Sequence, residues 1–297
     1  SEKEMLEAVL EDKGDFSVSQ ADRNATEKPP LNFDLTSLQW EANNLWSWSA
    51  RRTLSVAQEL YDTHKLTTYP RTDSRFLPED MMESISKTIR QLGAQDKLNP
   101  HSQRLIDDGL KNVKRNFDNS KVSDHYAIIP TGKIPPGSLS SDAAKLYELI
   151  ARQFLASFHP ESVWKVEKRT ASKQGQNFVK EARSLSTPGW RAVRPKKQDL
   201  PDGWGTLPAN PGQATITSHE FKEEKTKPPG RLKEAGLLRL MEHAGKKIED
   251  EDLAAAMKGK GLGTPATRAE TIEKLISREF IGRGKGGSLR ATPHGIK

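Results

Sequence analysis

The 297-residue sequence contains no cysteine. This absence excludes disulfides, thiolate zinc sites and cysteine nucleophiles, and it is compatible with a reducing cytoplasm, which is the compartment we expect. Long hydrophobic runs are also missing: no stretch of about eighteen apolar residues occurs, so the sequence predicts no transmembrane helix and no membrane partner. The segment after Ser1 is polar, lacks the apolar core of a signal peptide and has no initiating methionine, which predicts a fragment or processed form of a longer polypeptide.

The chain has few hydrophobic residues and many charged ones. Hydrophobic residues make up 34% of the sequence and charged residues 29%, which is typical of a globular protein with a large surface. The length is enough for about two or three domains. The net charge of +7 and an isoelectric point near 9.4 favour a polyanionic partner.

The stretch over residues 66–80, which reads LTTYPRTDSRFLPED, is the centre of the functional interpretation. Tyr69 follows a short β-prone run and precedes Pro70, which neither continues a β-ladder nor enters a helix interior. We therefore expect the tyrosine at a strand end with its hydroxyl at a surface. The following RTDSR supplies two guanidinium groups, a carboxylate and two hydroxyls, a set that suits a phosphodiester. A phenol with a pKa of about 10 becomes an effective nucleophile when positive charge or a general base assists it.

The motif YPRTDS, which begins at Tyr69, resembles the active-site signature of the type IA DNA topoisomerases. The longer LTTYPRTDSRFLPEDM is most similar to the bacterial topoisomerase III branch. Two further blocks occur in that family's order, SDHYAIIPTG at 123–132 and GLGTPATRAETI at 261–272. The resemblance implies an isomerase that cuts one DNA strand through a 5′-phosphotyrosine, passes another strand and religates without ATP. The partners it implies are single-stranded and negatively supercoiled DNA, in the bacterial nucleoid or on plasmids, bound by a monomer.

The resemblance also implies roles for individual residues. Tyr69 is the expected nucleophile, Arg71 the clamp on the phosphate and the transition state, and His125 a catalytic group that binds phosphate or shuttles a proton. The predicted DNA-binding residues are Asp73, Ser74, Thr267 and Arg268. The first two of these are also expected to orient the tyrosine loop.

The third block has the pattern of a helix start. Thr264 is the expected N-cap and Pro265 the first helical residue, so the backbone N–H groups of the first turn are free to bind a phosphate. Thr267 and Arg268 add a hydroxyl and a guanidinium to that turn. The same pattern also suits a purely structural cap.

The family also uses an N-terminal Toprim domain, whose glutamate and D-x-D acids bind Mg²⁺. Only 68 residues precede Tyr69, and no strand-anchored D-x-D lies among them. We therefore expect Mg²⁺ in the full-length enzyme but no metal site in this chain, which predicts that the chain alone is inactive. The acidic run Glu249–Asp252 precedes an amphipathic pattern, where it opposes the helix dipole, and is not predicted to bind metal.

The expected fold is α+β and multidomain, as part of the toroidal core that the resemblance implies. It comprises an arch-domain strand and linker (1–34), a mainly helical gate domain with the catalytic tyrosine (35–160), a β-rich arch domain (161–225) and a partial helical DNA-binding section (226–297). Periodicity predicts helices through Asn44 with a Thr36–Gln39 capping box, and over 49–61, 78–92 and 141–158. It predicts strands near 15–20 and over 162–170, 176–184, 189–193 and 214–221.

Trp40, Trp46 and Trp48 cluster between the first two predicted helices. Aromatic side chains stack on unpaired bases with a gain of about 1–3 kcal/mol each. These three lie within helical and turn patterning, so we predict that they belong to the core.

The alternative to an enzyme is a non-catalytic module that binds single-stranded DNA in the same basic cleft. Other tyrosine–phosphodiester enzymes fit less well. A rolling-circle relaxase needs a closely spaced histidine pair, whereas the seven histidines here are far apart. A tyrosine recombinase carries its nucleophile near the C-terminus, whereas Tyr69 lies in the first quarter of the chain.

Overall fold

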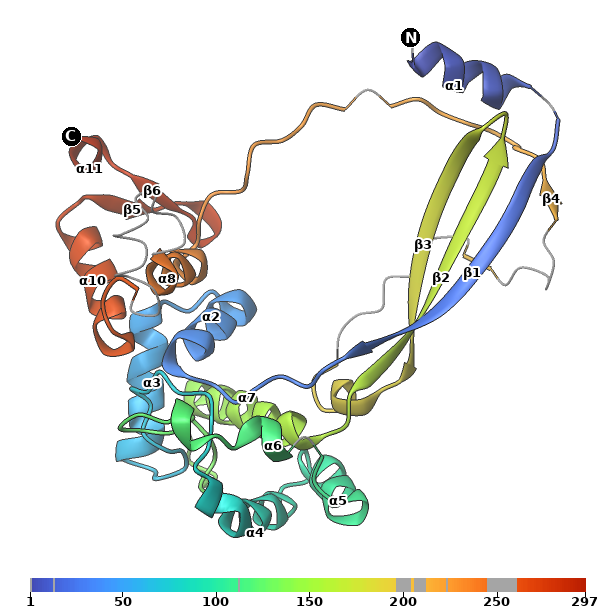
Figure 1. Cartoon of the computed structure of the whole chain (residues 1–297). Helices are drawn as coiled ribbons and strands as arrows, with labels where there is room; N and C mark the ends of the chain where they lie inside the picture. Colours follow the sequence, from blue (N-terminus) through green and yellow to red (C-terminus); the bar gives the residue numbers. More distant parts are fainter. Residues whose placement is uncertain are drawn as a thin grey trace. The chain divides into compact units, whose positions relative to one another are not determined.

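The structure is a computed structural model. It describes residues 2–12, 14–111, 113–195, 204–205, 212–222, 224–244 and 261–297. The chain divides into two compact units, which Figure 1 shows with the α-helices and β-strands labelled. The first unit comprises Ser1–Lys28 and Pro160–Pro228, and the second comprises Pro29–His159 and Pro229–Lys297. The chain therefore enters the second unit twice, and each unit is assembled from distant parts of the sequence.

The first unit is built on an antiparallel sheet with the strand order β3-β2-β1-β4. Its elements are α1 (Glu2–Glu11), β1 (Phe16–Glu27), β2 (Ser162–Lys173), β3 (Gln176–Thr187), η3 (Gly189–Ala192) and β4 (Gln213–Ala214). The β2–β3 connection consists of Gln174 and Gly175, both with positive φ, as the favoured two-residue hairpin turns require. The predicted strands near 15–20, over 162–170 and over 176–184 are therefore confirmed.

Two of the predicted strands are wrong. Residues 189–193 turn into the 3₁₀ helix η3, because Gly189 has a φ of +50° and a Cβ there would lie 2.3 Å from the backbone oxygen of Glu161. Trp190 then donates its indole N–H to the backbone oxygen of Glu27 at 3.0 Å, which holds η3 against the end of β1. Of the predicted strand over 214–221, only its first residue, Ala214, lies in a strand, the two-residue β4.

The second unit is mainly helical. Its first elements are α2 (Leu35–Trp46), α3 (Ala50–Asp62), η1 (Glu79–Met81), α4 (Met82–Leu92), α5 (Asn99–Asp108), α6 (Val113–Asn116), η2 (Asn119–Lys121) and α7 (Ser141–Phe158). Its last elements are α8 (Glu234–Glu242), α10 (Pro265–Ser277), β5 (Ile281–Arg283), η5 (Lys285–Gly287), β6 (Leu289–Ala291) and α11 (Pro293–Ile296). Helix α7 matches its prediction, and its Leu146, Ile150 and Phe154 are fully buried in the core. The α+β class is confirmed.

The start of α2 differs from the predicted capping box. The N-cap is Asp34, whose carboxylate accepts from the Ser37 backbone N–H at 2.7 Å, while the Ser37 hydroxyl accepts from the Asp34 N–H at 3.1 Å. An aspartate carboxylate is a stronger hydrogen-bond acceptor for the N–H groups of the first turn than a threonine hydroxyl is. The helix therefore begins two residues earlier than predicted. The box thus uses Asp34 and Ser37 instead of Thr36 and Gln39.

The three tryptophans do not share one environment. Trp48 is buried, with 4% of its surface exposed, as predicted. Trp40 and Trp46 are half-buried, so their assignment to the core was only partly right. The guanidinium of Arg239 lies 5.4 Å from the Trp40 ring, and the rings of Trp46 and Trp48 are 4.7 Å apart. A tryptophan at the edge of a core commonly keeps one face available for such a cation.

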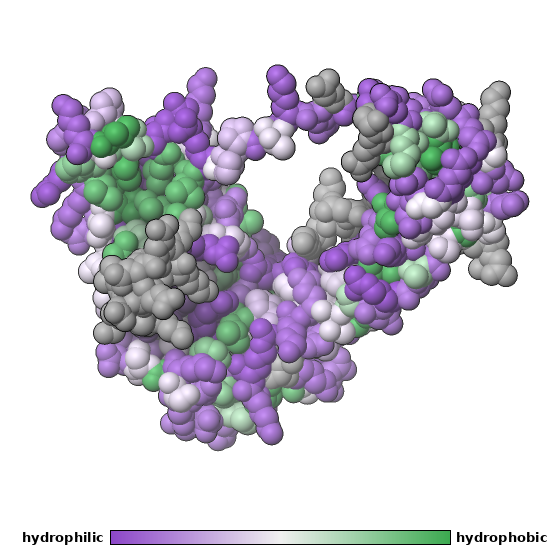
Figure 2. Space-filling model, turned by 45° about the horizontal axis from the view of Figure 1, so that its top comes forward, coloured by the Kyte–Doolittle hydropathy of each residue, from purple (hydrophilic) through white to green (hydrophobic). Residues whose placement is uncertain are grey.

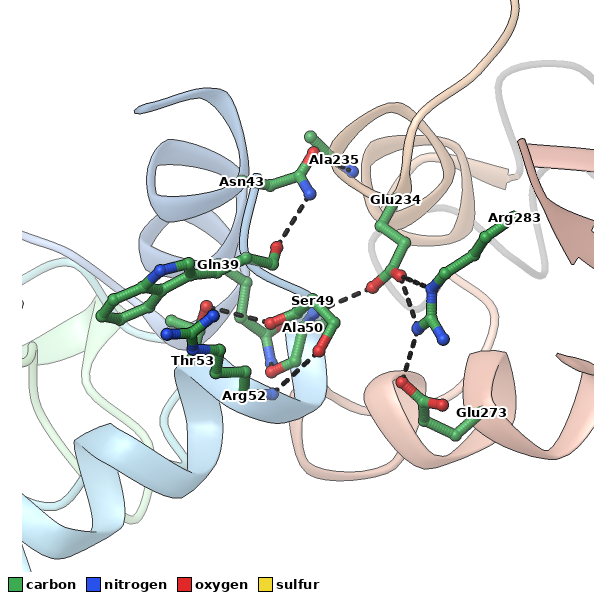
Figure 3. A network of polar contacts seen from close by, with 11 residues as sticks. Gln39, Asn43, Ser49, Ala50, Arg52, Thr53, Glu234, Ala235, Glu273 and Arg283 are labelled. Atoms are coloured by element: carbon green, nitrogen blue, oxygen red, sulfur yellow. Dashed lines mark hydrogen bonds and ion pairs between the residues drawn. The ribbon is translucent and has the colours of Figure 1, made fainter. Parts of the chain in front are cut away.

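A polar network ties the C-terminal section to α2 and α3 (Figure 3). The buried Glu234 accepts from the Ala50 backbone N–H at 2.9 Å and from Arg283 Nε at 2.8 Å. Arg283 also reaches Glu273 at 2.6 Å. Asn43 accepts from the Ala235 N–H at 3.3 Å. Glu234 therefore satisfies a free N–H group at the start of α3 while it binds the β5–β6 hairpin.

Hydrophilic side chains cover most of the face shown in Figure 2. This agrees with the high charged fraction of the sequence. Large apolar side chains that are more than half exposed among the described residues are Leu45, Ile134, Val179, Leu262 and Ile296.

The stability of the second unit is expected to fall in mild acid because of His159 at the end of α7. Its ring is 1% exposed, and burial together with the neighbouring His101 lowers its pKa from 6.5 to about 4. In the unfolded chain, His159 binds a proton below about pH 6.5, whereas in the folded chain it does so only near pH 4. The free energy of unfolding therefore decreases as the pH falls through that window. We expect a loss of roughly 2 kcal/mol between pH 7 and pH 5 from this group.

Chemical denaturation at the two pH values measures the effect. In His159→Gln the loss between pH 7 and pH 5 should shrink by that amount, whatever the variant's stability at pH 7. An unchanged pH dependence in the variant would show that other groups cause it.

Candidate active site

Tyr69 lies where a short extended segment ends, as predicted. Thr67 forms an antiparallel bridge with Pro130. The backbone N–H of Thr68 donates to Ile129 at 3.0 Å, and the Thr68 hydroxyl donates to the Ala127 carbonyl at 2.8 Å. The second sequence block, SDHYAIIPTG, is therefore the partner strand of the tyrosine segment. This pairing fixes the backbone immediately before Tyr69.

The Tyr69 ring lies between two other rings. His125 is 4.3 Å away between ring centroids, and Tyr61 of α3 makes an edge contact at 5.4 Å. The Thr72 hydroxyl donates to the His125 carbonyl at 2.9 Å, which holds the two loops together. The structure thus brings the predicted nucleophile and the predicted histidine into contact, with the tyrosine half-buried and His125 exposed.

Arg71 is held by two acceptors from different helices. Its Nη1 donates to the Ala266 carbonyl at the start of α10, at 3.2 Å. With the Gln58 amide oriented so that its oxygen faces the guanidinium, that oxygen accepts from Nε at 3.2 Å and from Nη2 at 3.1 Å. A guanidinium has five N–H groups, so two remain available for a phosphate.

A small cleft joins all three sequence blocks. Its volume is about 160 Å³. The residues that line it are Arg71, Thr72, Asp73, Ser123, Asp124, His125, Thr264, Pro265 and Ala266. Residues 71–73, 123–125 and 264–266 are far apart in the sequence but meet at this cleft, so the three blocks form one surface in the fold.

The start of α10 forms one wall of this cleft. Thr264 is its N-cap and Pro265 its first residue, as predicted. The Thr264 backbone N–H donates to the Thr267 hydroxyl at 2.9 Å, and both side chains are exposed. Gly261 has a φ of +65°, and a Cβ there would lie 2.6 Å from two backbone oxygens at the end of α8, so only glycine fits this approach.

The four predicted DNA-binding residues have different surroundings. Asp73 and Thr267 are exposed, and Asp73 accepts from the Ser123 hydroxyl at 3.1 Å. Ser74 is 4% exposed, and its hydroxyl donates to the Lys121 carbonyl at 2.7 Å. This contact orients the tyrosine loop, which is the other role predicted for Ser74, whereas its burial disfavours direct DNA contact.

Arg268 is also buried, with 4% of its surface exposed. Its guanidinium donates to the carbonyls of Leu262 and Gly263 at 3.1 Å and to the Thr36 hydroxyl at 3.0 Å. Burial lowers its pKa, while the carboxylates of Glu242 and Asp34 oppose that effect. These contacts favour a role in fixing the loop before α10 on α2. DNA contact by Arg268 stays a prediction that its burial disfavours.

A second, larger cavity adjoins Arg71 between α3 and α10, with a volume of about 530 Å³. The charged residues that line it are Arg51, Arg71, Glu270, Glu273 and Lys274. The cations and acids are mixed, so the cavity has no clear preference for a ligand of one charge.

No group of three or more His, Cys, Asp or Glu side chains within the described ranges is placed to hold a metal ion. The side chains in the described ranges therefore do not form a site that suits the Mg²⁺ implied by the family resemblance. The acidic run Glu249–Asp252 lies outside the described residues. In the part of the chain that the structure describes, no helix has the length and apolarity needed to cross a bilayer.

Comparison with known proteins settles the family. A family model described as DNA topoisomerase matches residues 1–297. The chain belongs to the DNA topoisomerase family. It is 38% identical over 278 residues to DNA topoisomerase 3 of Bacillus licheniformis and 36% identical over 291 residues to DNA topoisomerase 3 of Salmonella typhimurium. These relatives support the type IA and topoisomerase III resemblance of the YPRTDS motif.

The family members are much longer than this chain. The matched region is 90% of this chain but 38% of the Bacillus licheniformis protein, and 93% of this chain but 43% of the Salmonella typhimurium protein. In structure, the chain resembles full-length topoisomerase I of Thermotoga maritima with a TM-score of 0.70 and 24% identity, covering 98% of this chain and 45% of that one. This likeness supports the fold alone.

Proposed function

We propose that this chain carries the DNA-cleaving tyrosine of a type IA topoisomerase. The observation that carries the proposal is the contact of the Tyr69 ring with His125, which lines a cleft where the three family blocks meet together with an Arg71 guanidinium that has free donors. A phenol in contact with an imidazole, and a guanidinium that lines the same cleft as that imidazole, are the groups that phosphodiester exchange needs.

In the proposed reaction, the Tyr69 phenol oxygen attacks a phosphorus atom of single-stranded DNA and loses its proton. The bond from phosphorus to the 3′ oxygen of the preceding nucleotide breaks, and that oxygen leaves as a hydroxyl after it takes up a proton. The new bond is a 5′-phosphotyrosine. The free 3′ hydroxyl later attacks the same phosphorus and restores the strand, so one phosphoester replaces another and no ATP is consumed.

The residues around Tyr69 have separate roles in this scheme. The two remaining N–H donors of Arg71 bind the non-bridging oxygens, where negative charge grows in the transition state. His125 binds the phosphate or moves a proton at the phenol. The exposed Thr267 and the N-terminus of α10 bind the neighbouring phosphate of the same strand.

The wider setting is part of the proposal. Residues 35–160 act as the gate, residues 226–297 as a helical DNA-binding section, and residues 1–34 with 161–225 as the arch of a toroidal core. This core works as a monomer on single-stranded and negatively supercoiled bacterial DNA. In this proposal, a Toprim domain that binds Mg²⁺ completes the active centre. The chain alone is therefore expected to bind DNA without relaxing supercoils.

The experiment compares the chain alone with the chain mixed with a bacterial topoisomerase III Toprim domain, on negatively supercoiled plasmid with Mg²⁺. We expect no relaxation by the chain alone, relaxation by the mixture, and none by the mixture with Tyr69→Phe. Relaxation by the chain alone would overturn the requirement for the Toprim domain. Salt-sensitive binding of single-stranded DNA with no relaxation in any mixture would favour the non-catalytic binding module instead.

A further inference from the structure

Helix α3 presents two side chains of one face to the tyrosine loop. Gln58 and Tyr61 are three residues apart, which places them side by side on a helix. Gln58 contacts the Arg71 guanidinium through two hydrogen bonds, and Tyr61 contacts the Tyr69 ring at 5.4 Å. The two loop residues that the proposed reaction uses directly are therefore each held by one residue of α3.

A neighbouring face of α3 is buried in the second unit. Thr53, Ala57 and Leu60 are fully buried. The Leu60 carbonyl accepts from the backbone N–H of Leu66 at 2.9 Å, which connects the end of the helix to the segment before Tyr69. A side chain on such a helix has little freedom, so it is well suited to fix the position of its neighbour.

Arg71 needs this support because its other protein acceptor fixes one nitrogen only. The Ala266 carbonyl binds Nη1, and rotation about that single contact changes the direction of the free N–H groups. The Gln58 oxygen binds Nε and Nη2 on the other edge of the guanidinium, so the two acceptors together define its plane.

We infer that Gln58 and Tyr61 are positioning residues for the proposed cleavage reaction: Gln58 orients Arg71, and Tyr61 orients the nucleophile. The inference rests on the proposed function of Tyr69 and Arg71. Neither residue belongs to the cleft that receives the phosphate, so their loss should lower the rate of cleavage far more than the affinity for DNA.

The first test is a double-mutant cycle in the chain mixed with the Toprim domain. Gln58→Leu keeps the size of the side chain and removes the acceptor. It should slow single-turnover formation of the covalent adduct by about tenfold to a hundredfold, with the dissociation constant for the oligonucleotide changed less than about threefold. In an Arg71→Lys background the same change should have almost no further effect, since lysine lacks the paired donors.

Equal losses in both backgrounds would show a general structural effect and overturn the inference, as would a wild-type rate for Gln58→Leu. Gln103→Leu, on the exposed surface of α5, is the matched control and should cleave at the wild-type rate. For the second residue, Tyr61→Leu should slow cleavage, and Tyr61→Phe, which keeps the ring, should recover most of the rate. If Tyr61→Phe cleaves as slowly as Tyr61→Leu, the inference that the Tyr61 ring orients Tyr69 is wrong.

A second readout needs no catalysis. In the chain alone, the Nε–H resonance of Arg71 should exchange slowly with water, and Gln58→Leu should accelerate this exchange while Gln103→Leu leaves it unchanged. Fast exchange in the wild-type chain would overturn the role of Gln58. If the Arg71 resonance behaves as expected but no mixture forms an adduct, the contact between Gln58 and Arg71 is supported and the proposed function is wrong. If the adduct forms but Gln58→Leu changes neither the cleavage rate nor the exchange rate, only the positioning role is wrong.

Discussion

Arg71→Ala is expected to slow formation of the covalent adduct by about a hundredfold to a thousandfold, the usual cost of removing one preorganised donor from a developing negative charge. The structure gives the reason, because the guanidinium lies beside the cleft, is fixed by Ala266 and Gln58, and keeps two N–H groups for the phosphate. The measurement is single-turnover trapping of a labelled oligonucleotide by the chain mixed with the Toprim domain.

The affinity for DNA should change much less, because the transition state carries more charge on the oxygens that Arg71 binds than the ground state does. Arg104→Ala is a suitable control, since Arg104 is an exposed arginine of α5 that forms an ion pair with Asp108. Cleavage by Arg71→Ala at close to the wild-type rate would remove Arg71 from the proposed mechanism.

Glu234→Ala is expected to destabilise the second unit by about 3 kcal/mol. The carboxylate is buried and satisfies both the Ala50 N–H at the start of α3 and Arg283. Its removal leaves a buried backbone donor without a partner and detaches the β5–β6 hairpin from α3. The free energy of unfolding from denaturant titration measures the loss.

Glu273→Ala is the matched control, because Glu273 binds the same arginine from a more exposed position. We expect it to cost less than about 1 kcal/mol. Glu234→Gln should lie between the two, since the amide oxygen still accepts from the Ala50 N–H. Equal effects of the two alanine variants would show that the contact with Arg283, and not the cap of α3, carries the stability.

Local patterns predicted the framework of the helical unit well. The apolar periodicity over 141–158 correctly predicted α7, and Thr264 with Pro265 correctly predicted the start of α10. Both predictions succeeded because helix periodicity and capping depend on residues close in sequence. The position of Tyr69 at the end of an extended segment also followed from its neighbours. The pairing of this segment with Ala127–Pro130 was not predicted, since no local signal specifies which segments pair.

The predictions failed where a long-range contact decided the outcome. The GWRAV segment alternates like a strand, yet the close approach of Gly189 to Glu161 makes it turn. DNA contact by Arg268, which sits in a family motif beside a hydroxyl, stays a prediction, although its three hydrogen bonds lead into the protein. Gln58 was missed altogether, because a glutamine within an amphipathic helix carries no signal until the fold brings Arg71 to it.

The most direct test of the account is to locate the residue that becomes attached to DNA. The adduct formed by the chain, the Toprim domain and a single-stranded oligonucleotide is digested with trypsin and nuclease, and its peptides are analysed by mass spectrometry. Cleavage after Lys65 and Arg71 would release the peptide LTTYPR, in which Tyr69 is the only tyrosine. Trypsin is expected to cleave after Arg71 because the next residue is Thr72 and not a proline.

We predict a nucleotide joined through its 5′ phosphate to Tyr69. Two other phenols lie close by: Tyr61, against the Tyr69 ring, and Tyr126, whose pKa is raised by burial and by Tyr61. A nucleotide on either of these, a 3′ linkage, or an adduct that persists in Tyr69→Phe would contradict the assignment of Tyr69 as the nucleophile.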